Sequence, residues 1–169
     1  MKKFRPSWYV VYSRPRHEKK LANELAEMNI GSFLPTIKSL RTWNDRKKFV
    51  DSPLFPSYIF VYLKTAQEYF TCLGHDSVLF FVKQGKDVCQ VPQSIIDDIK
   101  LIIANGKNIE VCEDRLSPGK RLVIAEGPFT GFSCEIIDYK GRQRIWVRID
   151  LLKRNILLDL PIDYLAQTG

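Results

Sequence analysis

Residues 53–62 have the sequence Pro53-Leu54-Phe55-Pro56-Ser57-Tyr58-Ile59-Phe60-Val61-Tyr62. Two prolines bracket a turn, and the residues after the turn alternate between aromatic and aliphatic side chains. Because successive side chains of a strand point to opposite faces, this alternation predicts a strand with two distinct faces. The aliphatic face, with Ile59, Val61 and Leu63, is suited to packing on helices. The aromatic face carries Tyr58, Phe60 and Tyr62, which is too many large rings for ordinary solvent-facing surface.

A second stretch near the N-terminus, residues 8–12, repeats this pattern and places Trp8 and Tyr12 on one face. We expect the two stretches to be neighbouring strands of one sheet, with helices on one side and aromatic rings on the other. The function then depends on what binds to this aromatic face.

The remaining patterns of the first hundred residues predict the other elements of this sheet. Leu21, Leu25 and Met28 form the stripe of an amphipathic helix that begins near Arg16 and ends before Gly31. A strand is expected at residues 33–37, and the basic residues 38–50 around an Asn-Asp turn predict a protruding hairpin. Thr65 and Glu68 form a capping box for a helix that ends at Gly74. A strand at residues 78–82 and a helix from Pro92 to about residue 105 complete the unit.

The order β-α-β-(hairpin)-β-α-β-α is that of a ferredoxin-like split βαβ domain, an antiparallel sheet with helices on one face. After it, residues 105–117 lose the periodicity and are expected to be a linker. From Pro118 the sequence predicts short strands at residues 121–125, 132–139, 144–149, 156–160 and 164–166. Five short strands predict a small SH3-like β-barrel. The predicted fold class is therefore α+β, with domains at residues 1–104 and 118–169.

A helical stripe can also be drawn over residues 149–158. The β-branched residues that dominate this half of the chain favour strands, so we expect a permanent barrel with freely moving domains.

The net charge is +7 and lies in the N-terminal part of the chain. Residues 1–50 hold 12 Lys/Arg and 4 Asp/Glu, a net charge of +8, whereas residues 51–169 sum to −1. This asymmetry favours a polyanionic partner, nucleic acid first, although a merely solvated basic face remains an alternative.

The loop before the first helix contains Arg14, Arg16 and His17, and Lys20 follows in the first helical turns. Cations at a helix N-terminus oppose the helix dipole, which points to a functional reason for their placement. The basic hairpin either contacts a phosphate backbone or a second protein, or it is a solvated flap.

Other features exclude several classes of protein. No apolar run reaches the roughly 20 residues that a membrane span needs, and no secretory signal is recognisable, so a cytoplasmic protein is expected. The four cysteines are 17, 23 and 22 positions apart and form no Cys-x-x-Cys pair, so neither a metal, a cofactor nor a disulfide framework is expected. They are interpreted as small buried hydrophobic residues. The two histidines, His17 and His75, belong to no recognisable catalytic constellation, so the chain is not expected to be an enzyme.

Two motifs together carry a resemblance to a known family. Trp-Tyr-Val-Val at residues 8–11, with residues 53–61, resembles the N-terminal (NGN) domain of NusG-type transcription elongation factors. Residues 123–131, Val-Ile-Ala-Glu-Gly-Pro-Phe-Thr-Gly, resemble the KOW motif of the barrel that follows in that family. The likeness covers nearly the whole chain in the right order. Ser57 stands at a position where glycine is common in the family. With this variant, the motif is more similar to that of the specialised RfaH-like and UpxY-like antiterminators.

The resemblance implies a bacterial antitermination factor that acts without catalysis. Its aromatic face would bind the clamp helices of the largest RNA polymerase subunit, suppress pausing and promote read-through of specific operons. The residues that the resemblance and the face assign to polymerase binding are Trp8, Tyr12, Phe55, Pro56, Tyr58, Phe60 and Phe81. Arg14, Arg16, His17 and Lys20 match a basic patch that contacts the non-template DNA strand. Phe129 and Phe132 are candidates for a KOW contact to a ribosomal protein or a termination factor. The protein is expected to be a monomer.

Two alternatives remain for the aromatic face. RNA-recognition domains also stack bases on a ferredoxin-like sheet, but their glycine-aromatic strand signature is absent from residues 58–62. In RfaH-like proteins, a helical form of the C-terminal domain covers the polymerase site, so the face could also be buried at rest.

Overall fold

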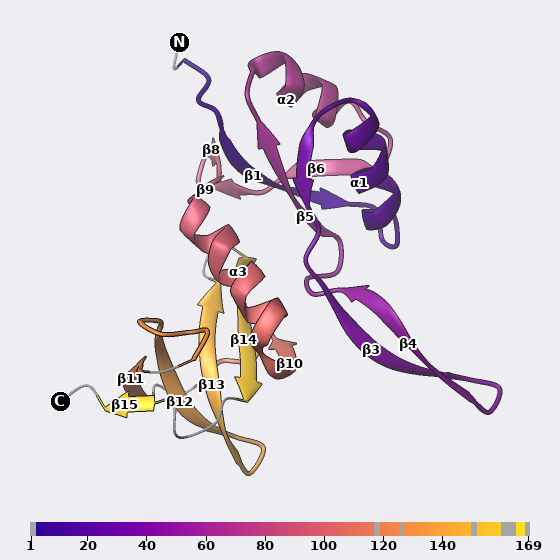
Figure 1. The fold of residues 1–169 in the computed structure, drawn as a ribbon. Helices are drawn as coiled ribbons and strands as arrows, with labels where there is room; N and C mark the ends of the chain where they lie inside the picture. The colour runs from indigo at the N-terminus through magenta and orange to yellow at the C-terminus, as the bar shows by residue number, and fades with distance from the viewer. Residues whose placement is uncertain (1–2, 117–118, 126, 150–151, 160–164, 168–169) are drawn as a thin grey trace. The chain divides into compact units, whose positions relative to one another are not determined.

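The computed structural model describes residues 3–116, 119–125, 127–149, 152–159 and 165–167. The chain divides into two compact units, Met1–Ile99 and Lys100–Gly169. Each unit has its own antiparallel β-sheet (Figure 1). No helix within the described ranges combines the length and the apolar character needed to cross a membrane.

The N-terminal unit is built on a sheet with the spatial order β2-β5-β1-β6, and β9 pairs with β1 as well. Its strands are β1 (Ser7–Ser13), β2 (Gly31–Phe33), β5 (Tyr58–Leu63), β6 (Val78–Phe81) and β9 (Gln90–Val91). Helix α1 (Glu18–Glu27) connects β1 to β2, and α2 (Ala66–Leu73) connects β5 to β6. The predicted α+β class and the predicted order of strands and helices are confirmed.

Both helices pack on one face of this sheet. Leu21 and Leu25 of α1 and Cys72 of α2 are fully buried in one cluster with Ile59, Val61 and Leu63 of β5. The aliphatic side of the 58–63 strand thus faces the helices, as its alternation predicts. This leaves the aromatic side of the sheet facing away from α1 and α2.

The two helix starts differ in how well the sequence predicts them. Thr65 caps α2, because its Oγ1 accepts a hydrogen bond from the Glu68 N–H at 3.2 Å, and Glu68 reaches back to the Lys64 N–H at 2.6 Å. The predicted start of α1 near Arg16 is wrong. Arg16 has a positive φ of 66° and lies in the loop, and α1 begins at Glu18. Arg16 and Lys20 are therefore not neighbours on one helical face.

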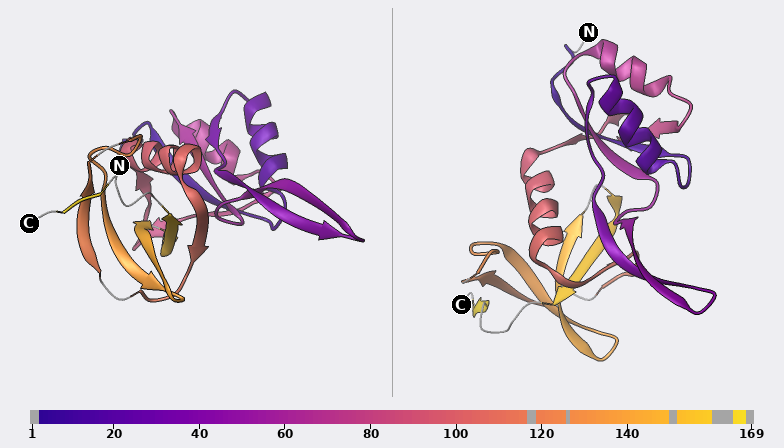
Figure 2. Two further views of the ribbon diagram at one scale, coloured as in Figure 1. Left: turned by 60° about the horizontal axis from the view of Figure 1, so that its bottom comes forward. Right: turned by 45° about the vertical axis from the view of Figure 1, so that its right-hand side comes forward.

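The predicted hairpin is confirmed as β3 (Thr36–Trp43) and β4 (Arg46–Pro53), which pair in register along their whole length. Asn44 and Asp45 both have positive φ, 38° and 68°, as a type I′ turn requires. Figure 2 shows the hairpin extending away from the sheet of its unit. The strand expected at residues 33–37 is wrong in detail, because Pro35 separates the end of β2 from the start of β3.

The sequence analysis does not predict three short strands. They are β7 (Lys83–Gln84), β8 (Asp87–Val88) and β9, each only two residues long. A run of two residues gives no periodicity, so their formation depends on pairing partners elsewhere. After them, α3 (Gln93–Asn105) begins directly behind Pro92, as predicted.

The C-terminal unit contains a sheet with the order β10-β14-β13-β12-β11-β15 among the described residues. Its strands are β10 (Lys107–Cys112), β11 (Lys120–Ile124), β12 (Ser133–Tyr139), β13 (Arg142–Ile149), β14 (Arg154–Asp159) and β15 (Leu165–Gln167). The five predicted strands are present, although the predicted ends Leu160 and Tyr164 lie outside the described residues. The expected linker contains the sixth strand, β10, which pairs with β14.

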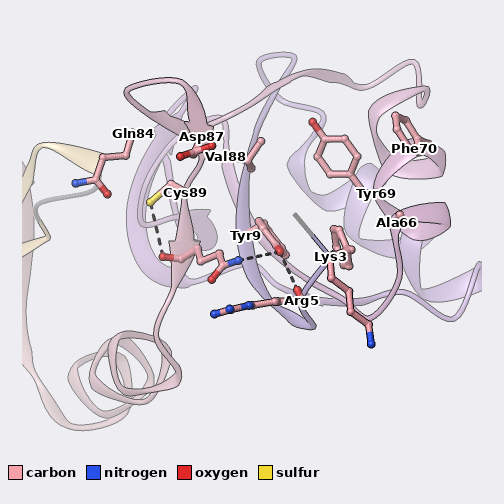
Figure 3. A pocket seen from close by; sticks show the side chains of 12 residues that line it. Lys3, Arg5, Tyr9, Ala66, Tyr69, Phe70, Gln84, Asp87, Val88 and Cys89 are labelled. Atoms are coloured by element: carbon pink, nitrogen blue, oxygen red, sulfur yellow. Dashed lines mark hydrogen bonds between the residues drawn. The ribbon is translucent and has the colours of Figure 1, made fainter. Parts of the chain in front are cut away.

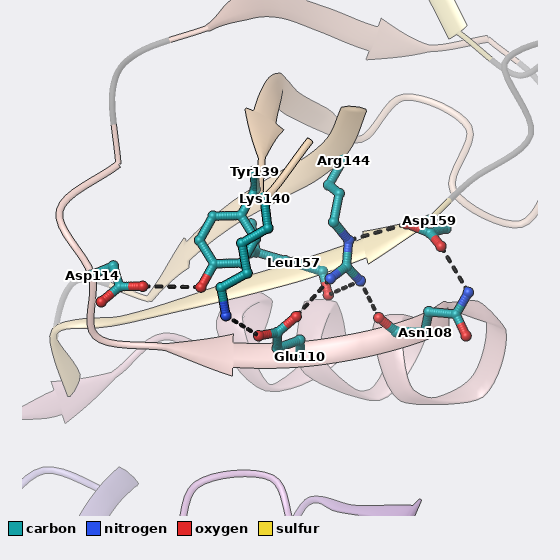
Figure 4. Close-up of polar contacts among 8 residues, drawn as sticks. All are labelled: Asn108, Glu110, Asp114, Tyr139, Lys140, Arg144, Leu157 and Asp159. Atoms are coloured by element: carbon teal, nitrogen blue, oxygen red, sulfur yellow. Dashed lines mark hydrogen bonds and ion pairs between the residues drawn. The ribbon is translucent and has the colours of Figure 1, made fainter. Parts of the chain in front are cut away.

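A buried arginine joins three strands of this sheet (Figure 4). The Arg144 side chain on β13 is only 2% exposed and donates to Glu110 Oε2 of β10 at 2.8 Å and to Asp159 Oδ1 of β14 at 3.1 Å. It also donates to the backbone oxygens of Asn108 and Leu157. A buried charge is tolerated only when it is paired and hydrogen-bonded, so Arg144 requires both β10 and β14 beside it.

Three of the four cysteines, Cys72, Cys89 and Cys134, are buried, and all four are free thiols. Burial raises the pKa of Cys72 to about 12 and that of Cys134 to about 11. These thiols are therefore neutral at physiological pH, as expected for small hydrophobic core residues.

Asp159 gives a pH-dependent prediction for the C-terminal unit. The side-chain amide of Asn108 donates to Asp159 Oδ2 at 2.7 Å, and this hydrogen bond, followed by the charge of Arg144, holds the pKa of Asp159 below its ordinary value. A depressed carboxyl pKa contributes stability that is fully present above the unfolded value of about 3.9 and is lost as the pH falls through the folded value. Asn108→Gly removes the amide and suits the positive φ of 50° at this position. We expect it to raise the Asp159 pKa, measured by NMR titration of the carboxyl carbon. An unchanged titration midpoint would contradict this account.

Candidate functional site

The face of the N-terminal sheet that points away from α1 and α2 is the first candidate surface. In an antiparallel sheet, directly opposed residues share a face. Trp8 opposes Tyr62, Val10 opposes Phe60 and Tyr12 opposes both Tyr58 and Phe80. Phe33 of β2 opposes Phe60 on the other side of β5. Residues from four strands therefore contribute to this face, and we call the partly exposed rings among them the aromatic row: Trp8, Tyr12, Phe33, Tyr58, Tyr62 and Phe80.

The rings of the aromatic row contact one another across the strands. Tyr12 stacks on Phe80 with ring centroids 4.9 Å apart and contacts Tyr58 edge to face at 5.1 Å. At the other end, Trp8 meets Tyr62 at 5.4 Å, and its indole N–H donates to Gln93 at the start of α3 at 2.7 Å. Such pairs fix ring orientation in addition to burying area. The row is a preformed surface of aromatic rings.

Phe81 needs a correction. The sequence analysis groups it with the aromatic face, but it is 2% exposed and lies in the core beneath α1 and α2, where it contacts Tyr9 and Tyr69. Its neighbour Phe80 is 49% exposed and belongs to the aromatic row. The sequence Leu-Phe-Phe-Val at residues 79–82 contains no polar residue, so alternation alone does not tell which phenylalanine points outward.

Phe55 and Phe60 are also too deeply buried to be directly exposed on a docking surface. Phe55 is 1% exposed and Phe60 is 0% exposed, and Phe60 stacks under Phe33 at 6.0 Å. Pro56, which is exposed, lies at the outer side of the turn. Phe60 therefore supports the surface beneath Phe33, and Phe55 is a buried residue of the turn. Truncating either would first cost packing energy, about 3–5 kcal/mol for a buried phenylalanine.

The turn that carries Phe55 and Pro56 is fixed by the backbone of Ser57. The Ser57 N–H donates to the buried carboxylate of Glu18 at 2.7 Å, and its carbonyl accepts from the Ser13 N–H at 2.7 Å. Ser57 has a positive φ of 69°, a conformation that glycine adopts more easily. The start of α1, the end of β1 and the turn before β5 are thereby joined at one residue.

The four basic-patch residues do not form one cluster. Arg14 donates to the backbone oxygen of Asp76 at 2.8 Å, and His17 Nδ1 lies 3.1 Å from the Ser77 hydroxyl. Lys20 lies 3.9 Å from Glu24 one turn along α1. Arg16 lies instead beside the β3–β4 hairpin, in a groove of about 370 Å³. The sequence analysis missed two further cations of that groove, Lys19 and Arg41.

Comparison with known proteins identifies the family. The family model described as transcription termination factor nusG matches residues 6–100, more than half of the chain. The chain belongs to the NusG family. A curated relative, the transcription termination/antitermination protein NusG of Lactococcus lactis subsp. lactis (strain IL1403), is 25% identical over 174 residues, covering 94% of this chain and 91% of its own length.

A solved structure shows the same fold. The NusG of Thermotoga maritima, from a study of its domain interaction, superposes with a TM-score of 0.56 at 20% identity and covers 98% of both chains. This NusG-family chain is thus an N-terminal NGN-type unit followed by a strand-rich C-terminal unit. The family consists of transcription termination and antitermination factors.

In the C-terminal unit of this NusG-family chain, the two candidate phenylalanines differ in exposure. Phe129 is 2% exposed, whereas Phe132 is partly exposed and meets it edge to face at 6.0 Å. The loop between them closes by a hydrogen bond from the Gly131 N–H to the Ile124 carbonyl at 2.7 Å, with Gly131 at a φ of 84°. Glu126 of the KOW-like motif lies outside the described residues. The exposed part of this pair is therefore the Phe132 ring.

A second hollow of about 1120 Å³ lies in the N-terminal unit (Figure 3). Lys3, Arg5, Tyr69 and Phe70 line it, and Tyr9 accepts from Gln90 and donates to the Arg5 carbonyl at its floor. Burial raises the pKa of Tyr9 and that of Cys89, which also lines the hollow. Both groups are protonated at neutral pH, so neither supplies a ready nucleophile.

Glu18 gives a stability prediction for the site. Glu18→Ala leaves the buried N–H of Ser57 without its carboxylate acceptor, and a hydrogen bond to a charged group contributes about 1.5–3 kcal/mol. We expect a loss of that size in the free energy of unfolding, measured by urea denaturation. The matched control is Glu27→Ala, an exposed carboxylate on the same helix, with an expected change within about 0.5 kcal/mol. Equal losses in the two variants would refute the role assigned to Glu18.

Proposed function

We propose that this chain is a bacterial antitermination factor that binds RNA polymerase through the aromatic row, suppresses pausing and promotes read-through of specific operons. The observation that carries the proposal is the row of partly exposed, mutually packed rings on a sheet face turned away from its own helices. Aromatic side chains are the usual anchors of protein interfaces, and an apolar groove or face is a common receptor for helices. The clamp helices of the largest polymerase subunit are the proposed occupant, by resemblance to the family.

The proposed polymerase contacts follow from exposure. They are Trp8, Tyr12, Tyr58 and Phe80, with Pro56 at the edge of the turn. Phe60 has the supporting role described above, and the buried Phe55 and Phe81 are not among the proposed contacts. A factor of this kind changes polymerase behaviour only through a difference in affinity between two polymerase states. We propose that this chain binds the active, unpaused state more tightly.

Two further contacts complete the proposal. Arg14, Arg16, His17 and Lys20 lie on or beside the loop that leads into α1 and are proposed to approach the non-template DNA strand. Their charges supply affinity that falls with salt concentration. Phe132 is the proposed contact of the C-terminal unit to a ribosomal protein or a termination factor. As in RfaH-like and UpxY-like paralogues, the chain is proposed to serve a restricted set of operons.

Single-round transcription by the cognate RNA polymerase tests the function. The templates carry pause sites and an intrinsic terminator downstream of the leader regions of the native operons. We expect shorter pauses and more read-through when the protein is added. If neither changes on these leaders, and if the protein fails to bind polymerase, the proposal is wrong.

Phe80 provides the sharpest test of the binding surface. Phe80→Ala removes a half-exposed ring that stacks on Tyr12, so it is expected to spare folding and to weaken polymerase binding by roughly 30-fold, the effect of losing a hot spot of about 2 kcal/mol. The matched control is Phe70→Ala, which removes a 63% exposed ring on α2, away from the aromatic row. Binding is measured by titration of labelled protein with polymerase. Equal weakening by both variants, or by neither, would contradict the assignment of the surface.

A further inference from the structure

The hollow of about 1120 Å³ in the N-terminal unit has no part in the proposed polymerase contacts (Figure 3). It is lined by the N-terminal arm, which we define as residues 3–6, by helix α2 and by the short strands β7, β8 and β9. Tyr9 of β1 forms its floor. Because Tyr9 follows Trp8 of the aromatic row along one strand, its ring points to the opposite side of the sheet. The hollow therefore lies on the helix side.

Aromatic rings line the hollow and are held in place from behind. Phe4 of the arm stacks on Tyr9 with ring centroids 5.7 Å apart and meets Tyr69 of α2 at 6.4 Å. Tyr69 in turn contacts the buried Phe81 at 4.6 Å. The Tyr9 hydroxyl donates to the Arg5 carbonyl at 2.8 Å, which fastens the arm to the sheet. This lining is ordered before any partner arrives, which reduces the entropy that binding costs.

The rim of the hollow exposes apolar surface that contributes little to the fold. Phe70 of α2 lines the hollow, contacts Tyr69 edge to face at 5.3 Å and remains 63% exposed. Leu73 lies on the same face of the helix, three residues further on, and is 40% exposed. Adjacent exposed apolar side chains with a polar surround are typical of protein interaction sites. The rim therefore offers an apolar contact to a partner.

The arm adds two cations to this apolar surface. Lys3 and Arg5 are exposed and line the hollow, and neither forms an ion pair within the described residues. Asp87 is the one acidic residue among the described residues of the lining. Figure 3 shows Asp87 on the other side of Tyr9 from both cations. The arm side of the hollow is thus positively charged, and carboxylates are its complement.

We propose that the hollow binds an acidic peptide segment of a partner protein, with a large apolar side chain packed against Phe70 and with carboxylates paired to Lys3 and Arg5. A peptide suits this surface better than a nucleic acid does, because the aliphatic Leu73 offers no ring for base stacking and because two cations match a few carboxylates better than a continuous run of phosphates. The aromatic row lies on the other side of the sheet, so the chain can hold this partner and polymerase together.

Selection from a phage-displayed library of random twelve-residue peptides tests the chemistry of the partner. The full-length protein is the target, and the Lys3→Glu, Arg5→Glu double variant serves to remove peptides that bind elsewhere. We expect the retained peptides to be rich in Asp and Glu next to Phe, Trp or Leu. Recovery of no peptide, or of peptides that lack acidic residues, overturns the proposal.

The apolar contact is measured with the tightest selected peptide, synthesised with a fluorescent label. Phe70→Ala is expected to weaken binding by about 5- to 30-fold, the effect of losing an interface anchor, and to spare folding because the ring is exposed. The matched control is Phe80→Ala, which removes a 49% exposed ring of the aromatic row and is expected to leave the Kd unchanged. Circular dichroism checks that both variants fold. Equal Kd values for wild type and folded Phe70→Ala contradict the site.

The charge contacts are tested by two pairs of substitutions at low ionic strength. Lys3→Gln with Arg5→Gln is expected to weaken peptide binding by about 2- to 30-fold, the sum of two exposed ion pairs, and to reduce its dependence on salt. Lys47→Gln with Lys48→Gln removes two exposed cations of the hairpin and is the matched control, with no change expected. Equal weakening by both pairs would show a diffuse attraction to a basic protein and no specific site.

NMR titration of the full-length protein with the same peptide locates the contact. We expect the largest shifts in the backbone amide signals of residues 66–73 and 87–90, and shifts confined to the aromatic row overturn the proposal. A mixed-sequence, ten-nucleotide single-stranded RNA is titrated in parallel. If it binds more tightly than the peptide and is weakened by Phe70→Ala, the hollow is a nucleic-acid site.

Failure of this site and failure of the proposed function are distinguishable, because the peptide measurements need no polymerase. If the peptide binds as expected but the protein neither binds polymerase nor changes read-through, the peptide site stands and the proposed function fails. If transcription responds as expected but no acidic peptide binds at the hollow, the proposed function stands and the peptide site is wrong.

Discussion

The N-terminal unit depends on the two backbone hydrogen bonds of Ser57. One joins the turn before β5 to β1 through Ser13, and the other joins it to α1 through the buried carboxylate of Glu18. A buried carboxylate is costly unless it is hydrogen-bonded, so α1 and the turn are positioned together. This single junction lies between the two candidate surfaces, because the turn leads directly into Tyr58 of the aromatic row, whereas Pro56 and Glu18 line the groove.

The two sides of the N-terminal sheet differ in burial. Its helix side is an apolar core in which Ile59 and Val61 are fully buried against α1 and α2. Its other side keeps Tyr12 and Phe80 stacked but partly exposed. Strand alternation makes this division possible, since one strand supplies residues to both sides. Rings on a sheet that is anchored from behind lose little conformational freedom on binding, which would favour affinity at the proposed interface.

The C-terminal unit is held together in a different way, by a buried cation. Arg144 reaches across to β10 and β14, so residues that look like a linker become a strand of this sheet. Removing one partner of such a network would leave an uncompensated buried charge, which is strongly destabilising. A helical stripe is also conceivable over residues 149–158, but Ile149 ends β13 and residues 154–158 belong to β14, so these described residues are strand.

The sequence by itself determined the class of fold, the order of the longer strands and helices apart from β10, the hairpin and its turn, and the capping of α2. These are local properties: alternation, helical stripes and turn residues act within a few positions. Only the tertiary structure decided that Phe80 and not Phe81 faces outward. Residues 79–82 contain no polar residue that would indicate the outer face, and the register with β1 sets it instead. It also decided that residues 107–112 form a strand and that Arg16, Lys19, Arg41 and Trp43 meet at one groove. These outcomes depend on partners that are distant in the chain. No local sequence pattern specifies which distant segments will pair or be buried together.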